Sequence, residues 1–178
     1  MISLKPAIIL VRPQLPENIG MVARVMQNFN LKDLILVEPR EKFPNNKAIK
    51  SSKSASSIIK KAKIYNSISE AVSTFKIIVA TTNRKRFLEK KNINQFTTLN
   101  RLLQLSNKSA VLFGPENSGL SNEDLRLADY LFTIDTSNHN NSLNLSHAVA
   151  ITTYKINEYF EKNNKRKINQ KKQLADQC

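Results

Sequence analysis

The stretch Ala110-Val-Leu-Phe-Gly-Pro-Glu-Asn-Ser-Gly-Leu-Ser121 contains an apolar run, a turn and a helix start. Its first four residues predict a buried strand, and the Gly-Pro pair after them predicts a turn. Ser121 and Asp124 have the spacing of a capping box, in which hydroxyl and carboxylate each accept a backbone N–H at the start of a helix. Strand, loop and helix in this order are typical of an α/β fold.

The loop in this stretch holds Gly114 and Gly119, two of the three glycines of the chain. Glycine suits a backbone that takes a positive φ or lies very close to another group. The loop is therefore either a tight connection or a place where the backbone approaches a ligand. A second polar run, residues 140–146, leads into an apolar helix, and its short side chains could cap backbone groups or hold a ligand.

The length of 178 residues predicts one domain, residues 1–161, with a basic tail over residues 162–178. The only cysteine, Cys178, excludes an internal disulfide and a thiolate metal cluster. No apolar run has the length of a secretory signal or a membrane span. We therefore expect a cytoplasmic protein without a membrane partner.

The formal net charge is +14, from 28 Lys and Arg against 14 Asp and Glu. Such a balance predicts attraction to a polyanion, either nucleic acid or an anionic membrane surface. Nucleic acid is favoured because the basic residues are clustered, although a composition rich in Lys, Asn and Ile can also reflect biased codon usage. The tail suits a sequence-independent grip on phosphates, either as a disordered segment or as a helical extension.

The apolar pattern predicts strands alternating with helices, and hence a parallel sheet flanked by helices. The loop after the first strand lacks G-x-G-x-x-G, which excludes the usual dinucleotide-binding turn. The expected strands are residues 7–11, 34–37, 77–80, 110–113 and 130–134. The expected helices are residues 19–29, 47–63, 97–105, 122–129 and 143–160.

The first predicted helix is apolar nearly all round except for Arg24. Asn18 is its expected N-cap, and the apolar pattern predicts that the whole helix is buried. A buried guanidinium needs a partner, so Arg24 either pairs with a carboxylate of the fold or meets a ligand. Gly20, one turn earlier, leaves room for a backbone, a phosphate or a ligand.

The predicted strand 77–80 runs into Thr81-Thr-Asn-Arg-Lys-Arg86. Arg84, Lys85 and Arg86 would place positive charge at the carboxyl end of a parallel strand, the edge where α/β sheets bind ligands, so we expect phosphate contacts there. His139 and His147 lack the partners of a metal site or a catalytic triad, and we expect neither to be catalytic.

Three motifs together resemble the SPOUT superfamily of knotted RNA methyltransferases, in its SpoU/TrmH branch, which methylates ribose 2′-hydroxyls. They are Pro16-Glu-Asn-Ile-Gly-Met-Val-Ala-Arg24, Phe113-Gly-Pro-Glu-Asn-Ser-Gly-Leu120 and Ser142-Leu-Asn-Leu-Ser146, and the similarity covers about residues 5–160. The run that begins at Thr81 resembles the TrmJ-like tRNA methyltransferases, which modify the pyrimidine at position 32 of the anticodon loop.

The resemblance implies a parallel sheet flanked by helices, with a deep C-terminal trefoil knot, an exception to the rule against threaded chains. It implies S-adenosyl-L-methionine (AdoMet) bound in the knot, no metal, a tRNA substrate and a homodimer whose active site uses both chains. The implied cofactor-binding residues are Thr81, Thr82, Asn83, Gly114, Gly119, Ile134, Asn141, Ser142, Leu143 and Asn144.

The resemblance also assigns Arg24 as the catalytic arginine, in a reaction where a ribose 2′-oxygen attacks a sulfonium methyl. Because a guanidinium keeps its proton in proteins, Arg24 suits phosphate binding and stabilisation of the developing alkoxide better than proton removal. The remaining catalytic candidates are Asn18, Glu116, Ser142 and Asn144, and the RNA-binding candidates are Arg84, Lys85 and Arg86.

One departure leaves the target open. TrmJ-like proteins commonly carry a C-terminal helical extension that assists tRNA binding, whereas this chain has only a short basic tail. The wobble nucleotide of tRNA and ribosomal RNA are alternative targets, and a non-catalytic RNA-binding SPOUT protein is the alternative from another functional class.

Overall fold

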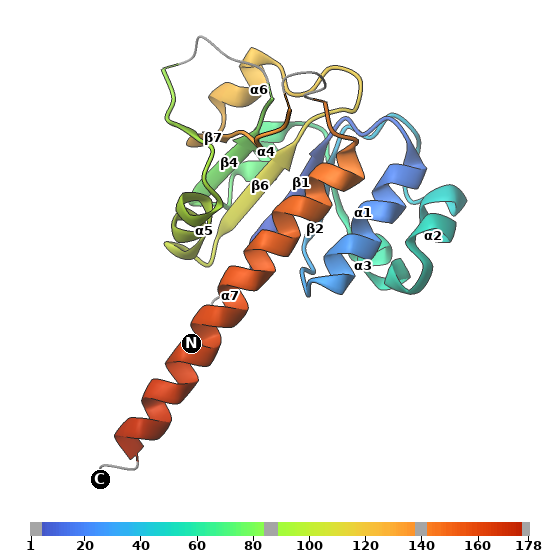
Figure 1. Ribbon diagram of the computed structural model, residues 1–178. Helices are drawn as coiled ribbons and strands as arrows, with labels where there is room; N and C mark the ends of the chain where they lie inside the picture. The colour runs from blue at the N-terminus through green and yellow to red at the C-terminus, as the bar shows by residue number, and fades with distance from the viewer. Residues whose placement is uncertain (1–4, 84–88, 138–141, 176–178) are drawn as a thin grey trace.

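The computed structural model describes residues 5–83, 89–137 and 142–175, which form a parallel sheet flanked by helices (Figure 1). The seven strands of the described residues lie in the order β3-β2-β1-β6-β4-β7-β5, and every pairing is parallel. Their bounds are β1 Ala7–Val11, β2 Leu34–Val37, β3 Lys63–Tyr65, β4 Ile77–Thr81, β5 Asn92–Ile93, β6 Ser109–Phe113 and β7 Tyr130–Phe132. The α/β prediction is confirmed.

The central strands β1 and β6 are buried along their whole length. Successive side chains of a strand point to opposite faces, so a strand covered on both faces must be apolar throughout. Ile8 and Val111 are paired across the two strands and belong to the core on one face, and their neighbours Ile9 and Leu112 belong to the core on the other. The continuous apolar runs of the sequence therefore reflect two cores.

The helices are α1 Pro16–Asn28, α2 Asn46–Ser52, α3 Ser56–Lys61, α4 Ile68–Val72, α5 Phe96–Gln104, α6 Asn122–Arg126 and α7 Leu145–Ala175, with a 3₁₀ turn, η1, at Lys53–Ala55. The single helix expected over residues 47–63 is wrong. The chain bends at Lys53, whose φ is 52°, and the segment becomes two short helices followed by β3. The elements β3, α4 and β5 were not predicted, because each is short and lacks a long periodic pattern.

The last helix, α7, is longer than expected. We predicted an end near residue 160, whereas the helix continues to Ala175, and Figure 1 shows its C-terminal half extending beyond the rest of the molecule. Of the two alternatives for the basic tail, the structure therefore shows the helical extension. Among the described residues, no helix has the length and apolar character needed to cross a membrane. The domain boundary at residue 161 and the knot stay predictions.

Two expectations for α1 are wrong. The helix begins at Pro16 rather than after Asn18, because proline suits the first helical position, where the backbone N–H has no helical partner. Arg24 is exposed, not buried, because one side of α1 faces solvent, and Met21 on that side is 38% exposed.

Gly20 lies where α1 packs against α2. A Cβ added at Gly20 would lie 1.9 Å from Ser51 Oγ, 2.3 Å from the Ala48 carbonyl oxygen and 2.8 Å from the Ser52 nitrogen. The sequence left open whether a backbone, a phosphate or a ligand occupies the space beside Gly20. The structure shows a backbone, that of α2.

We expect Gly20→Ala to lower the free energy of unfolding by about 1–3 kcal/mol, since the methyl group would push α2 away from α1. The result would be diagnostic because Gly→Ala inside an exposed helix normally stabilises by about 1 kcal/mol. Urea denaturation measures the change in the free energy of unfolding, and Asn28→Ala, at an exposed position of the same helix, is the control. Unchanged or increased stability of Gly20→Ala would contradict this packing.

Candidate active site

A pocket of about 190 Å³ lies at the carboxyl ends of β4, β6 and β7. This edge is where parallel α/β sheets bind ligands. Its walls come from four segments that are far apart in the sequence: the end of β4, the loop after β6, the residues after β7, and the start of α7. The sheet order explains their meeting, because β4 lies between β6 and β7.

Most of the residues predicted to bind a cofactor line this one pocket. They are Thr81, Thr82, Asn83, Gly114, Gly119, Ile134, Ser142 and Leu143. Asn141 lies outside the described residues, as do the RNA-binding candidates Arg84, Lys85 and Arg86. The structure thus brings together residues 81–83, 114–119 and 142–143, while their role in binding stays a prediction.

Asn144 is not among the pocket residues and caps α7 instead. Its Oδ1 accepts hydrogen bonds from the Ser146 backbone N–H, at 2.9 Å, and from the Ser146 hydroxyl, at 2.8 Å. The polar run before α7 was predicted either to cap backbone groups or to hold a ligand. For Asn144 the structure shows the cap, which fixes the start of the helix beside the pocket.

The floor of the pocket is apolar and its rim is polar. The buried side chains of Phe113, Phe132 and Leu145 form the floor, and Phe132 packs edge-on against Phe96 with ring centroids 5.0 Å apart. At the rim, the Thr81 hydroxyl donates to the Leu112 carbonyl at 2.9 Å and so ties the end of β4 to β6. An apolar floor with a few positioned polar groups is typical of small-molecule sites.

The two loop glycines have different roles. A Cβ on Gly114 would lie 2.3 Å from the Leu120 backbone nitrogen, so Gly114 lets the loop close on itself. Gly119 has a φ of +67°, a conformation that other residues rarely adopt, and a Cβ there would meet nothing within 4 Å. The close approach at Gly114 is therefore to its own loop, whereas Gly119 faces open space in the pocket wall.

Glu116 joins this loop to the start of α1. One carboxylate oxygen accepts from the Gln14 backbone N–H at 2.9 Å, and the other accepts from Asn18 Nδ2 at 2.7 Å and the Leu15 backbone N–H at 3.4 Å. Asn18 is only 3% exposed. Both residues were catalytic candidates, and their geometry gives them an anchoring role that we call the Glu116 clamp.

A second charged contact, missed in the sequence, involves Arg12. Its guanidinium pairs with Asp124 and, at 3.6 Å, with Glu38. The Asp124 carboxylate also accepts from the Ser121 N–H at 2.8 Å, and the Ser121 hydroxyl accepts from the Asp124 N–H at 3.1 Å, which confirms the capping box. The sequence signal that could have indicated these ion pairs is the position of Arg12 directly after a buried strand.

Arg24 does not line the pocket. It lies six residues beyond Asn18, which is about 9 Å along the helix axis, and α1 runs away from the pocket edge. The structure of one chain therefore does not bring Arg24 together with Ser142. Among the described residues, no group of three His, Cys, Asp or Glu side chains could hold a metal ion.

Comparisons with known proteins give one consistent result. The profile of the SpoU rRNA Methylase family matches residues 5–154. The tRNA (cytidine-2′-O-)-methyltransferase TrmJ of Methanocaldococcus jannaschii is 34% identical over 153 residues, which cover 84% of this chain and 66% of that protein. The tRNA (cytidine/uridine/adenosine-2′-O-)-methyltransferase TrmJ of Pseudomonas aeruginosa is 32% identical over 152 residues, or 84% of this chain and 59% of that protein.

The crystal structure of TrmJ from Z. mobilis superimposes with a TM-score of 0.81 at 38% identity, covering 86% of this chain and 69% of that one. This chain therefore spans only about two thirds, or less, of the length of these relatives.

The Glu116 clamp predicts a loss of stability that is independent of any ligand. Glu116→Ala should lower the free energy of unfolding by about 2–3 kcal/mol, because the buried Asn18 amide and two backbone N–H groups lose a charged acceptor. Chemical denaturation of the apo protein measures it.

In a double-mutant cycle, Glu116→Ala and Asn18→Ala should be non-additive, because the two side chains share one hydrogen bond. The exposed Glu41→Ala serves as control and should change stability by no more than about 0.5 kcal/mol. Additive effects of the pair would contradict the clamp.

Proposed function

This chain belongs to the SpoU rRNA methylase family, and from that premise we propose that it is an AdoMet-dependent RNA ribose 2′-O-methyltransferase. We propose tRNA as its substrate and the pyrimidine at position 32 of the anticodon loop as its target. The substrate proposal is supported by relatives that are named tRNA 2′-O-methyltransferases and are 32–34% identical to this chain. We also propose a cytoplasmic location, which agrees with a tRNA substrate.

The pocket suits AdoMet by the chemistry of its walls. The apolar floor would hold the adenine, and the backbone of the loop between Gly114 and Leu120, with residues 81–83, Ile134 and Ser142–Leu143, would hold the polar parts. Gly119 leaves this wall open, since a Cβ there would meet nothing within 4 Å. When bound, AdoMet supplies a methyl group activated by the adjacent sulfonium.

The protein has to position the ribose 2′-hydroxyl for in-line attack and to stabilise the charge that develops on its oxygen. We assign the second task to Arg24, whose guanidinium is exposed and would hold an RNA phosphate beside the reacting ribose. Ser142 lines the pocket with an exposed side chain, and we assign its hydroxyl to the ribose or to Arg24.

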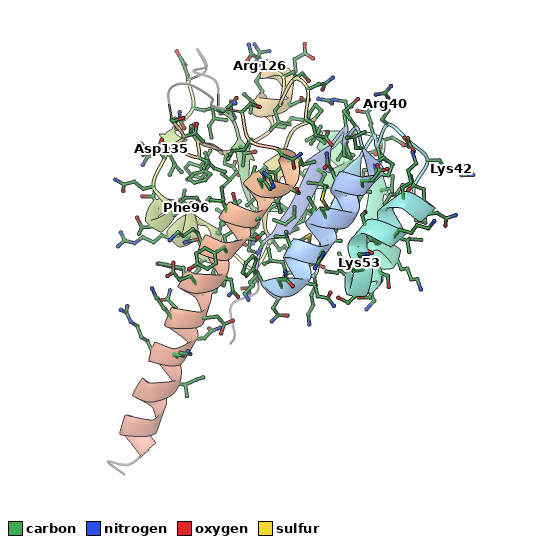
Figure 2. The ribbon with its side chains drawn as sticks, turned by 45° about the vertical axis from the view of Figure 1, so that its right-hand side comes forward. Arg40, Lys42, Lys53, Phe96, Arg126 and Asp135 are labelled. Atoms are coloured by element: carbon green, nitrogen blue, oxygen red, sulfur yellow. The ribbon has the colours of Figure 1, made fainter. Side chains whose placement is uncertain are left out.

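The single observation that carries this proposal further is the separation of Arg24 from the pocket of its own chain. Arg24 lies on the outward side of α1 with Met21, and the neighbouring α7 exposes Ile151 and Tyr154, at 37% and 49%. Figure 2 shows α1 and α7 side by side on one face of the sheet. We propose that a homodimer covers this apolar face and delivers Arg24 to the partner's pocket.

Methyl transfer from labelled AdoMet into a tRNA transcript should be detectable with the wild type and reduced by Arg24→Ala by about 10²-fold or more, as for loss of a group that stabilises the transition state. Arg101→Ala, an exposed arginine on α5, is the matched control and should keep full activity. Transfer that survives Arg24→Ala would contradict the assigned role.

The same assay tests the target when single riboses are replaced. A transcript with 2′-deoxyribose at position 32 should accept no label, whereas 2′-deoxyribose at wobble position 34 should have no effect. The reverse result would favour the wobble nucleotide, and labelling of ribosomal RNA alone would favour an rRNA target. AdoMet binding without transfer into any RNA would contradict the proposed activity, and a protein that binds RNA but no AdoMet would favour the non-catalytic alternative.

A further inference from the structure

The segment from residue 40 to residue 63 carries half of the net charge of the chain. It contains eight Lys or Arg and one acidic residue, Glu41, for a net charge of +7 against +14 for the whole sequence. All eight basic side chains are exposed, and among the described residues none forms an ion pair. Figure 2 shows Arg40, Lys42 and Lys53 on this side of the molecule. We call this segment the basic platform.

The platform is fixed to α1 rather than free to move as a loop. The α2 backbone packs directly on Gly20, and Gln27 exchanges two hydrogen bonds with Ser54, at 3.0 and 3.4 Å. Asn45 caps α2 through the Ala48 N–H at 3.0 Å. The backbone that carries its lysines is therefore held in place, which lowers the entropy cost of ordering this segment on binding.

The platform adjoins Arg24. Residues three and four apart share one side of a helix, and Arg24 lies four residues after Gly20 and three before Gln27. Both of those residues contact the platform, so Arg24 emerges at its border with an exposed side chain. A polyanion lying along the platform would therefore lie close to Arg24 of the same chain.

We infer that the basic platform binds the phosphate backbone of the RNA substrate and leads it to Arg24; this inference rests on the proposed function. A membrane surface fits less well, because interfacial helices bury an apolar face in lipid. Here the apolar side chains, including Phe43, Ile58 and Ile59, are already buried in the protein core. Only the charged side is exposed, which suits backbone phosphates.

The test compares two triple variants with equal loss of charge. Lys42, Lys47 and Lys50 are changed to Gln in the platform variant. Lys32, Lys76 and Lys108, all exposed at the amino ends of β2, β4 and β6, are changed to Gln in the control. The dissociation constant for a tRNA transcript is measured between about 50 and 200 mM salt, the range over which phosphate contacts are most visible.

We expect the platform variant to bind tRNA about tenfold more weakly at low salt. The slope of the logarithm of the binding constant against the logarithm of the salt concentration should fall in magnitude by about 2, because three phosphate contacts are lost and each contributes about 0.7 to the slope. Its KM for tRNA should rise, while its kcat at saturating tRNA and its affinity for AdoMet stay at the wild-type values. The control variant should resemble the wild type in slope. If tRNA binding were weakened equally in both variants, or in neither, the inference that the platform binds RNA would be overturned.

Two further outcomes separate this inference from the proposed function. Vesicles of phosphatidylserine and phosphatidylcholine that bind the wild type but not the platform variant, with tRNA binding unchanged, would overturn the platform in favour of a membrane. A wild type that binds tRNA through these lysines but transfers no methyl group would support the platform and overturn the proposed function.

Discussion

The position of α1 beside the pocket depends on one carboxylate. Glu116 lies in the loop after β6 and accepts three hydrogen bonds, two from the backbone just before α1 and one from the buried amide of Asn18 in its first turn. An ionised acceptor is satisfied by such donors and costly to bury without them. The clamp therefore fixes two things together: the shape of the loop that forms one wall of the pocket, and the direction in which α1 leaves it.

The direction of α1 decides where Arg24 lies relative to the pocket. Since the helix starts at the pocket edge and runs away from it, Arg24 comes to lie about two turns from Asn18 and outside the pocket of its own chain. The same helix holds the basic platform through Gly20 and Gln27. The pocket, Arg24 and the basic platform are thus joined by one rigid element, with Arg24 outside the pocket of its own chain.

The sequence was sufficient for the parts of the fold that local patterns determine. β1 and β2 have the predicted bounds because their apolar runs are short and sharply ended. The capping box at Ser121 was predictable because it depends only on two residues three positions apart. The exposure of Arg24 was not predictable, since it depends on which neighbours cover α1. The anchoring role of Glu116 depends on a contact 98 residues away in the chain, at Asn18, which no local pattern reports.

The account depends most on the claim that one active site uses Arg24 of one protomer and the pocket of the other. Mixing two inactive variants tests it: Arg24→Ala, and Ala148→Phe, which fills the pocket. After subunit exchange, half of the dimers are mixed, and each contains one complete site if the arginine acts across the interface. The prediction is recovery of about a quarter of the wild-type methyl transfer. A mixture as inactive as its two components would contradict the shared site.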